Sequence, residues 1–261
     1  MNIVVCIKQV PDTTEVRIDP VTNTLIREGV PSIVNPFDEN AIESALQVKE
    51  KLGGKITVIT MGPPQAAEAL KSAIAMGVDD VILINDRAFA GSDTWATSYT
   101  VAAAIKKIKD FDIILCGKQA IDGDTAQVGP GIAEWLGIAQ ITNVKKIEVA
   151  DNKVKCNRET EDETQIVEAA LPVLITVVKQ INEPRMPSLK GQMKAKKVVI
   201  PNWTVADLDV KRENLGLDGS PTKVVKIFNP PQKGGGMMID GASPDEIASK
   251  LVEKLKEQKV F

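Results

Sequence analysis

The feature that most constrains this chain is an alternation of short apolar runs with helical patterns along its first 137 residues. The runs with a strand pattern are residues 3–7, 55–60, 80–84 and 111–116. The helical patterns that separate them begin at 36, 66 and 93. Asn35 is a suitable N-cap for the first of these helices, and Pro36 fits its first helical position. Strands that alternate with helices through short links form a parallel sheet. We therefore expect an α/β fold with a doubly wound, mainly parallel sheet.

The last of these strands leads into the stretch most informative about function, residues 111–136. Its loop combines Gly117, Gly123 and Gly129 with the acids Asp122 and Asp124, and a helical pattern follows. Glycine lets backbone approach a phosphate, and a helix start favours negative charge, so these are the parts of a nucleotide site. The alternative is a structural turn whose polar residues cap the helix. The loop matches neither a Walker A motif nor a G-x-G-x-x-G fingerprint.

The strand ends favour the nucleotide interpretation. In a doubly wound sheet, ligands bind beyond the carboxyl ends of the strands. Those ends fall here at residues 6–9, 60–62 and 116–129. We expect the three segments to converge on one cleft.

Composition excludes several classes of partner and site. The chain of 261 residues has a net charge of −3 and 3% aromatic residues, so we expect binding neither to nucleic acid nor to an anionic membrane. No apolar run approaches the roughly 20 residues that span a bilayer. Cys6, Cys116 and Cys156 lack the spacing of a metal site, and with no signal peptide in the sequence we expect a cytoplasmic protein with free thiols. Since there is no histidine, any chemistry must come from carboxylates, lysines, thiols or a bound cofactor, and the absence favours a cofactor carrier.

The second half of the chain has a different pattern. We expect a small hairpin within residues 15–27, and an antiparallel extension of the sheet over about 140–180, with 173–178 entering the core. The nucleotide-binding domain would then span residues 1–200. Residues 182–197 contain no obvious element, and they form either a solvated loop or a partner-binding loop in which Leu189 is an apolar anchor.

The remaining residues, 201–261, have the character of an arm. We expect a strand at 223–228, a Pro- and Gly-rich linker at 230–236, and a helix that Ser243 caps. Ile247 and Leu251 contribute to a narrow apolar stripe on that helix. The stripe packs either on its own domain or on a partner subunit, and we take the second alternative for the arm as a whole.

Five stretches together resemble one family, the beta subunits of electron-transfer flavoproteins. They are VCIKQVPD at 5–12, VNPFDENAIESA at 34–45, GKQAIDGDTAQVGP at 117–130, NRETEDETQIVEAALPVLIT at 157–176 and NEPRMPSLKGQMKAKK at 182–197. The resemblance implies an adenine-nucleotide-binding α/β fold. It also implies a heterodimer with an alpha subunit that carries an FAD and shuttles electrons.

The same resemblance implies functional residues. Apart from the resemblance, Lys8, Gln9 and Arg158 are candidates for tuning flavin charge, with a solvated or ion-paired side chain as the alternative for each. Of these three, Lys8 is added to the nucleotide site. The resulting cofactor-binding set is Cys6, Lys8, Asn35, Asp38, Met61, Gly117, Gln119, Ala120, Ile121, Asp122, Gly123, Asp124, Thr125, Gln127 and Val128. Leu189 falls at the place of the family's partner-anchoring leucine, and Met193 is assigned to the same surface. Arg158 and Glu159 match a charged pair that the family places near the shuttling flavin.

One departure within the loop separates two functions. Members that bind a structural AMP resemble GKQAIDDD followed by NQTGQ, whereas here Gly123 replaces an acid and TAQVGP follows. This resembles the electron-bifurcating branch, in which a second FAD takes the place of AMP. Such a subunit takes electrons from NADH. It passes one to ferredoxin or flavodoxin and the other, through the alpha-subunit FAD, to an acyl-CoA dehydrogenase-type partner.

Two alternatives remain beside bifurcation. One is a conventional electron carrier with AMP in the beta subunit, and the other is a stand-alone nucleotide-sensing module. Because electron transfer chemistry belongs to the flavin, we name no catalytic residue, and whether the chain counts as an enzyme stays open.

Overall fold

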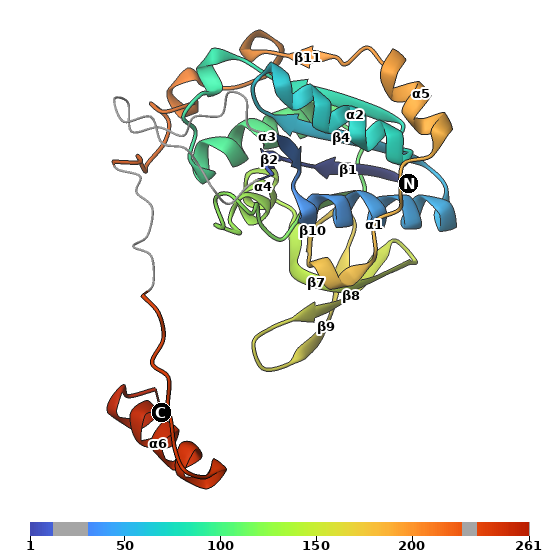
Figure 1. The fold of residues 1–261 in the computed structure, drawn as a ribbon. Helices are drawn as coiled ribbons and strands as arrows, with labels where there is room; N and C mark the ends of the chain where they lie inside the picture. Colours follow the sequence, from blue (N-terminus) through green and yellow to red (C-terminus); the bar gives the residue numbers. More distant parts are fainter. Residues whose placement is uncertain (13–30, 226–233, 261) are drawn as a thin grey trace. The chain divides into compact units, whose positions relative to one another are not determined.

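The computed structural model describes residues 1–12, 31–225 and 234–260, and it divides the chain into two compact units, Met1–Val225 and Lys226–Phe261. The first unit is built on a nine-stranded sheet with the order β11-β5-β4-β1-β6-β10-β7-β8-β9 (Figure 1). The strands of this sheet are β1 (Asn2–Cys6), β4 (Lys55–Met61), β5 (Asp80–Ile84), β6 (Ile113–Gly117), β7 (Ala139–Ala150), β8 (Lys153–Glu159), β9 (Thr164–Ala170), β10 (Val173–Val177) and β11 (Asn202–Trp203). Every pairing from β11 to β7 is parallel, and those of β8 and β9 are antiparallel. The expected α/β fold with a mainly parallel sheet is confirmed.

Helices cover both faces of the parallel part. They are α1 (Pro36–Leu52) and α2 (Ala67–Met76) on one face, and α3 (Thr94–Ile108) and α4 (Val128–Leu136) on the other. Alternation along β1 explains the two layers, because successive strand residues point to opposite faces. Ile3 and Val5 join the apolar cluster of α1 and α2, whereas Val4 joins that of α3 and α4.

The antiparallel extension is also present. β7 pairs in parallel with β10 along its first half and antiparallel with β8 along its second half. Asn143 lies where the pattern changes, with a left-handed φ of 56° that Asn tolerates better than most residues. β10 lies between β6 and β7, and all five of its residues are buried. The expectation that this run enters the core is therefore confirmed.

The structure corrects one expectation in residues 182–197. The second part of this segment is a helix, α5 (Leu189–Lys197), in which the Ser188 side chain accepts a hydrogen bond from the amide of Gly191. The pattern hid this helix because Ala195 is its one buried residue. The helix instead packs directly against α2 at Gly191. The approach is so close that a Cβ at Gly191 would lie 2.1 Å from the carbonyl oxygen of Ala75.

Other expectations fall partly outside the described residues. The hairpin expected within 15–27 lies outside them. The described strands on either side of this gap, β2 (Gln9–Pro11) and β3 (Ser32–Val34), pair antiparallel. Of the strand expected at 223–228, only residues 223–225 are described, and they are not a strand. In the second unit, Ser243 is the N-cap of α6 (Pro244–Glu257). Its side chain accepts a hydrogen bond from the amide of Glu246, as expected. None of the helices in the described parts of the chain is long and apolar enough to cross a bilayer.

Candidate nucleotide site

The candidate site lies at the carboxyl ends of β1, β4 and β6. The parallel pairing places Cys6 beside Ile59 on one side and Cys116 on the other, so the loops after these strands begin at one level of the sheet. Cys6 and Met61 are partly buried at their strand ends. Hydrogen bonding with Cys6 and burial raise the pKa of the Cys116 thiol, which makes it a packing group rather than a reactive one.

Asp38, in the first turn of α1, connects two of these strand ends. Its Oδ2 accepts from the amide of Lys8 at 2.7 Å, and its Oδ1 accepts from the amide of Gly117 at 3.1 Å. Burial raises the pKa of this carboxyl group to about 7, against the lowering effect of hydrogen bonds from Lys8, Asn35 and Gly117. A buried carboxylate is costly unless it is hydrogen-bonded, so Asp38 and the two loops hold one another in place.

Asn35 connects the same region to the glycine-bearing loop. It stands at the N-cap position of α1, but its side chain does not cap the helix. Its Nδ2 instead donates to the carbonyl of Gln119 at 2.8 Å, and its Oδ1 accepts from the amide of Ile121 at 3.2 Å. The Asn35 amide also donates to the carbonyl of Lys8 at 2.9 Å. One side chain therefore fixes the path of residues 119–121.

Lys8 and Asp122 form an ion pair within the site. The Nζ of Lys8 lies 2.7 Å from Oδ1 and 2.8 Å from Oδ2 of Asp122. The Lys8 side chain is 48% exposed, so the pair adds little stability by itself. It does bring a cation from the end of β1 to the middle of the loop after β6.

The next part of the loop has unusual backbone. Asp124 and Ala126 adopt left-handed φ values of 52° and 54°, which are uncommon for residues other than glycine. The Gln119 side chain donates to Asp124, and the amide of Asp124 donates to the carbonyl of Ala120 at 2.9 Å. Strained loops of this kind are frequent in ligand clamps.

Gly123 differs from the other glycines of this region. A Cβ at Gly123 would meet no atom of the described residues within 4 Å, whereas one at Gly117 would lie 2.4 Å from Asp38 Oδ1. Gly129 and Gly131 bring α4 close to β10 and α3, since their Cβ atoms would lie 2.7 Å from Thr176 and Ser98. Packing among the described residues thus requires glycine at 117, 129 and 131 but not at 123.

The start of α4 completes the arrangement. Gln127 precedes the helix, and its Oε1 accepts from the hydroxyl of Thr94 at 3.2 Å, which ties the loop to the start of α3. The first turn of a helix leaves amide groups without intrahelical acceptors, and these favour an anion. The structure brings the predicted cofactor residues together around the ends of β1, β4 and β6. The role of each residue at a ligand stays a prediction.

The predicted partner residues lie elsewhere, on α5. Leu189 is 81% exposed and Met193 62% exposed. Met186, absent from the predicted set, is 87% exposed just before this helix. Its position between Pro184 and Pro187 was the available signal, since proline on both sides keeps an apolar residue out of a regular element.

Arg158 stands apart from both groups, on β8. Its Nε is buried and has no hydrogen-bond partner within the described parts of the chain. Its Nη1 lies 3.5 Å from the Gln165 side chain, at the limit of a hydrogen bond. The Oε1 of Glu159 lies 3.9 Å from the Nζ of Lys145.

A cavity of about 530 Å³ lies away from the predicted residues, between α3, the end of α4 and the segment after β11. Lys107 and Asp207, on its walls, pair with each other, because Lys107 donates to the carbonyl of Asp207 at 2.8 Å. Lys107 also stands 4.4 Å from the ring centre of Trp203. No residue of the predicted cofactor set lines this cavity.

Comparison with known proteins gives a consistent result. The family model described as "Electron transfer flavoprotein domain" matches residues 22–208. The chain is 55% identical over 258 residues to the electron transfer flavoprotein subunit beta of Clostridium acetobutylicum, covering 99% of both chains. It is 52% identical to subunit CarD of the caffeyl-CoA reductase-Etf complex of Acetobacterium woodii, over 100% of both chains. It is 46% identical to Protein FixA of Bradyrhizobium diazoefficiens, covering 89% of this chain and 84% of that one.

Proposed function

Because the chain belongs to the electron transfer flavoprotein beta subunits, we propose that it works with an alpha subunit as an electron-bifurcating flavoprotein in the cytoplasm. The pair accepts electrons from NADH at an FAD in the beta subunit. It delivers one electron to ferredoxin or flavodoxin. The other passes through the alpha-subunit FAD to an acyl-CoA dehydrogenase or enoyl-CoA reductase partner.

The observation that carries this proposal is the loop between β6 and α4. Its first part is held by Asn35 and Asp38, whose side chains bond to the backbone of Gly117, Gln119 and Ile121. The open space at Gly123 and the amide groups at the start of α4 fit a diphosphate, and Lys8 adds a cation. The residues present therefore fit an adenine dinucleotide such as FAD.

In this arrangement the protein binds and orients, while the flavin, when bound, supplies the electron transfer. Gly117, Gln119, Ala120, Ile121 and Thr125 present the loop to the cofactor. Cys6 and Met61 border it from the strand ends. Lys8 and Asp122 would place one charge of each sign near it and so influence the local electrostatic potential.

Bifurcation is favoured over the AMP-binding alternative by the sequence of this loop. Gly123 and TAQVGP depart from the AMP-binding pattern at a position where packing among the described residues does not require glycine. The full-length likeness to a subunit of a caffeyl-CoA reductase-Etf complex supports the same choice. The alternative remains a carrier with structural AMP that accepts electrons from acyl-CoA dehydrogenases.

The balance of electrons tests this function. Purified heterodimer is mixed with NADH, ferredoxin, an enoyl-CoA and the matching dehydrogenase. Bifurcation predicts one electron on ferredoxin for each NADH oxidised, and one saturated acyl-CoA for every two NADH. Ferredoxin reduction that continues without enoyl-CoA, or enoyl-CoA reduction that continues without ferredoxin, would contradict it.

A further inference from the structure

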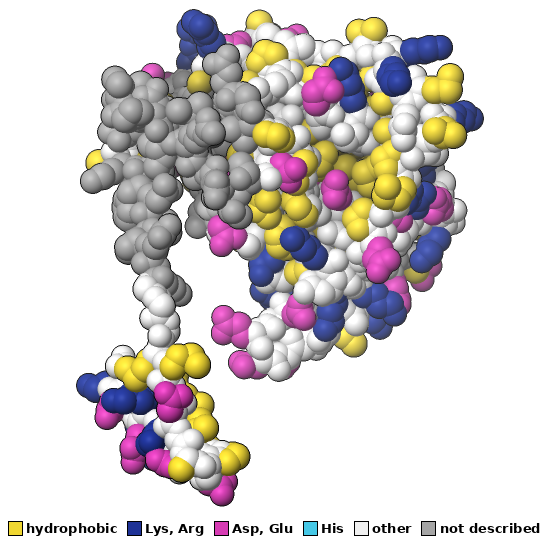
Figure 2. Space-filling view, viewed as in Figure 1, with side chains coloured by type: hydrophobic (Ala, Val, Ile, Leu, Met, Phe, Trp, Pro, Cys, Tyr) yellow, Lys and Arg dark blue, Asp and Glu magenta, His cyan; other side chains and the backbone are white. Residues whose placement is uncertain are grey.

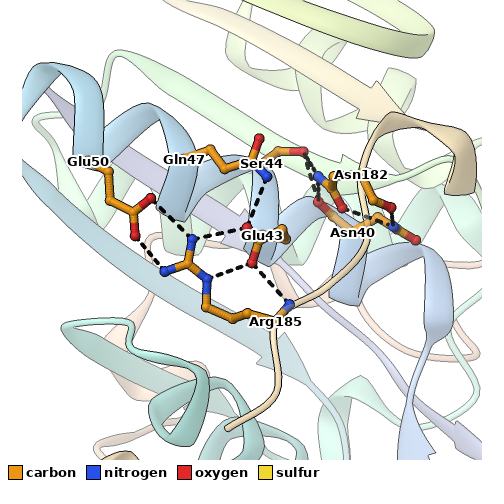
Figure 3. Close-up of polar contacts among 7 residues, drawn as sticks. All are labelled: Asn40, Glu43, Ser44, Gln47, Glu50, Asn182 and Arg185. Carbon is orange, nitrogen blue, oxygen red and sulfur yellow. Dashed lines mark hydrogen bonds and ion pairs between the residues drawn. The ribbon is translucent and has the colours of Figure 1, made fainter. Parts of the chain in front are cut away.

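One face of α1 carries a row of polar residues that the nucleotide site does not use. They are Asn40, Glu43, Ser44, Gln47 and Glu50, whose spacing of three and four places them on one side of a helix. Asn40, Glu43 and Ser44 are each 4% exposed. Figure 3 shows that this row faces the segment with Asn182 and Arg185, just before α5.

Arg185 forms ion pairs with two carboxylates of this row, those of Glu43 and Glu50. Its Nε and Nη2 donate to the two oxygens of Glu43 at 2.7 and 3.0 Å, and its Nη1 and Nη2 reach the two oxygens of Glu50 (Figure 3). The backbone amide of Arg185 donates to Glu43 as well, at 3.2 Å. Burial acts to raise the pKa of Glu43, but the hydrogen bonds from Arg185 and Gln47 outweigh it and hold that pKa below its usual range. Glu43 is therefore a charged buried group whose main partner is Arg185.

A second contact fixes the start of the same segment. Asn40 Nδ2 donates to the carbonyl of Asn182 at 2.8 Å and to that of Lys179 at 3.2 Å. In return, Asn182 Nδ2 donates to the carbonyl of Asn40 at 3.1 Å and to the Ser44 hydroxyl at 2.8 Å. These hydrogen bonds fix the backbone at Asn182, three residues before Arg185, against α1.

The exposed apolar residues begin immediately after Arg185. Met186, Leu189 and Met193, the apolar triplet, lie between the Arg185 contact on α1 and the packing of α5 on α2. On the α2 side, Lys194 Nζ donates to the carbonyl of Val78 at 3.0 Å. Anchors on both sides therefore hold three exposed apolar side chains on a defined surface.

The charge around the triplet indicates the chemistry of its partner. Lys190, Lys196 and Lys197 are exposed on α5, and basic and hydrophobic side chains lie next to one another on the surface there (Figure 2). A complementary surface has an apolar pocket with an acidic rim. We take the partner as the acyl-CoA dehydrogenase-type flavoprotein of the proposed function, on which this inference rests.

We propose that Arg185 is a positioning residue for docking. Its hydrogen bonds to Glu43 and Glu50 hold the apolar triplet in the arrangement that binds the partner, already in the unbound protein. Arg185 itself need not touch the partner. Binding is weakened when flexible segments have to be ordered on association, and a preformed surface avoids that loss. Arginine suits this role because its planar fork engages carboxylates with two bonds, which lysine does not reproduce.

The test measures electron transfer to the dehydrogenase by intact heterodimer over a range of dehydrogenase concentrations. We expect Arg185→Gln to raise the half-saturating concentration about tenfold and to leave the maximal rate within about twofold. Arg185→Lys should lie between this variant and the wild type. The control is Lys107→Gln on α3, which removes a positive charge from an ion pair with Asp207. It lies on the other face of the sheet from α2 and α5 and should change neither quantity.

Two further variants separate the possible outcomes. Leu189→Ala tests the docking surface itself, and Glu50→Gln removes only the exposed carboxylate of the fork, which covers the case in which Arg185→Gln does not fold. If Leu189→Ala raises the half-saturating concentration while Arg185→Gln and Glu50→Gln leave it unchanged, the role of Arg185 is overturned and the docking surface stands. If Leu189→Ala has no effect either, the docking surface is wrong. A fall in maximal rate alone would overturn the positioning role.

Discussion

Asp38 and Gly117 occupy adjoining space so closely that a Cβ on residue 117 would lie 2.4 Å from Asp38 Oδ1. The amide of Gly117 donates to that same oxygen at 3.1 Å. This relationship joins the start of α1 to the end of β6, and it sets the point from which the candidate nucleotide loop departs.

Gly117→Ala should therefore disturb the site. The added methyl group also approaches Phe37 Cβ at 2.6 Å, so we expect a loss of about 1–3 kcal/mol in the free energy of unfolding, together with less bound nucleotide. Urea unfolding and nucleotide content measure the two effects. Gly123→Ala is the matched control, because its methyl group meets nothing in the parts of the chain that the structure describes. A stability change below about 0.5 kcal/mol is expected there, and a larger one would show that the described loop is wrong.

Asp38→Asn should weaken the hydrogen bonds by which residue 38 joins the ends of β1 and β6. An amide has one oxygen where the carboxylate offers two acceptors, so one of the amides of Lys8 and Gly117 loses its partner. The expected loss is about 1–3 kcal/mol in the free energy of unfolding. Denaturant titration at fixed pH measures it. An unchanged free energy would mean that these hydrogen bonds do not support the fold.

The same carboxyl group predicts a pH dependence. Burial raises the pKa of Asp38 from its usual value to about 7, so between about pH 4 and pH 7 the folded state binds more protons than the unfolded one. The stability of the wild type relative to Asp38→Asn should then fall as the pH rises through this window, by at most about 1.4 kcal/mol per pH unit. Unfolding both proteins at several pH values tests the sign. A relative stability that increases with pH would show that the two amides keep Asp38 ionised.

Lys8→Gln should separate cofactor binding from stability. The ion pair with Asp122 is half-exposed on the lysine side, so its loss should lower the free energy of unfolding by less than about 1 kcal/mol. Removal of the cation should nevertheless weaken binding of an anionic nucleotide. Equilibrium dialysis of the heterodimer against FAD measures this effect. Unchanged affinity would make Lys8 a surface ion pair with no role at the cofactor.

Much of this fold follows from local pattern. Val4 and its neighbours form a run that is apolar on both faces, so β1 was recognisable as a central strand, and Asn35-Pro36 marked the start of α1. The α5 helix was missed because Gly191 and its contact with Ala75 stabilise it, and tertiary contact leaves no periodicity in the sequence.

The candidate site shows the same division. The glycine-bearing loop was visible as a motif, but Asp38 resembles any acid in the first turn of a helix until its contact with Gly117 is seen. Likewise, the pairing of Arg185 with Glu43 joins residues 142 positions apart, a distance over which local pattern carries no information.

The most direct measurement of the central claim is the nucleotide content of the purified heterodimer. The protein is denatured, and FAD and AMP are separated by chromatography and quantified per mole of heterodimer. The proposed function predicts two FAD and no AMP. One FAD and one AMP would contradict bifurcation and would make Gly123 a neutral variation in the loop of a conventional electron carrier.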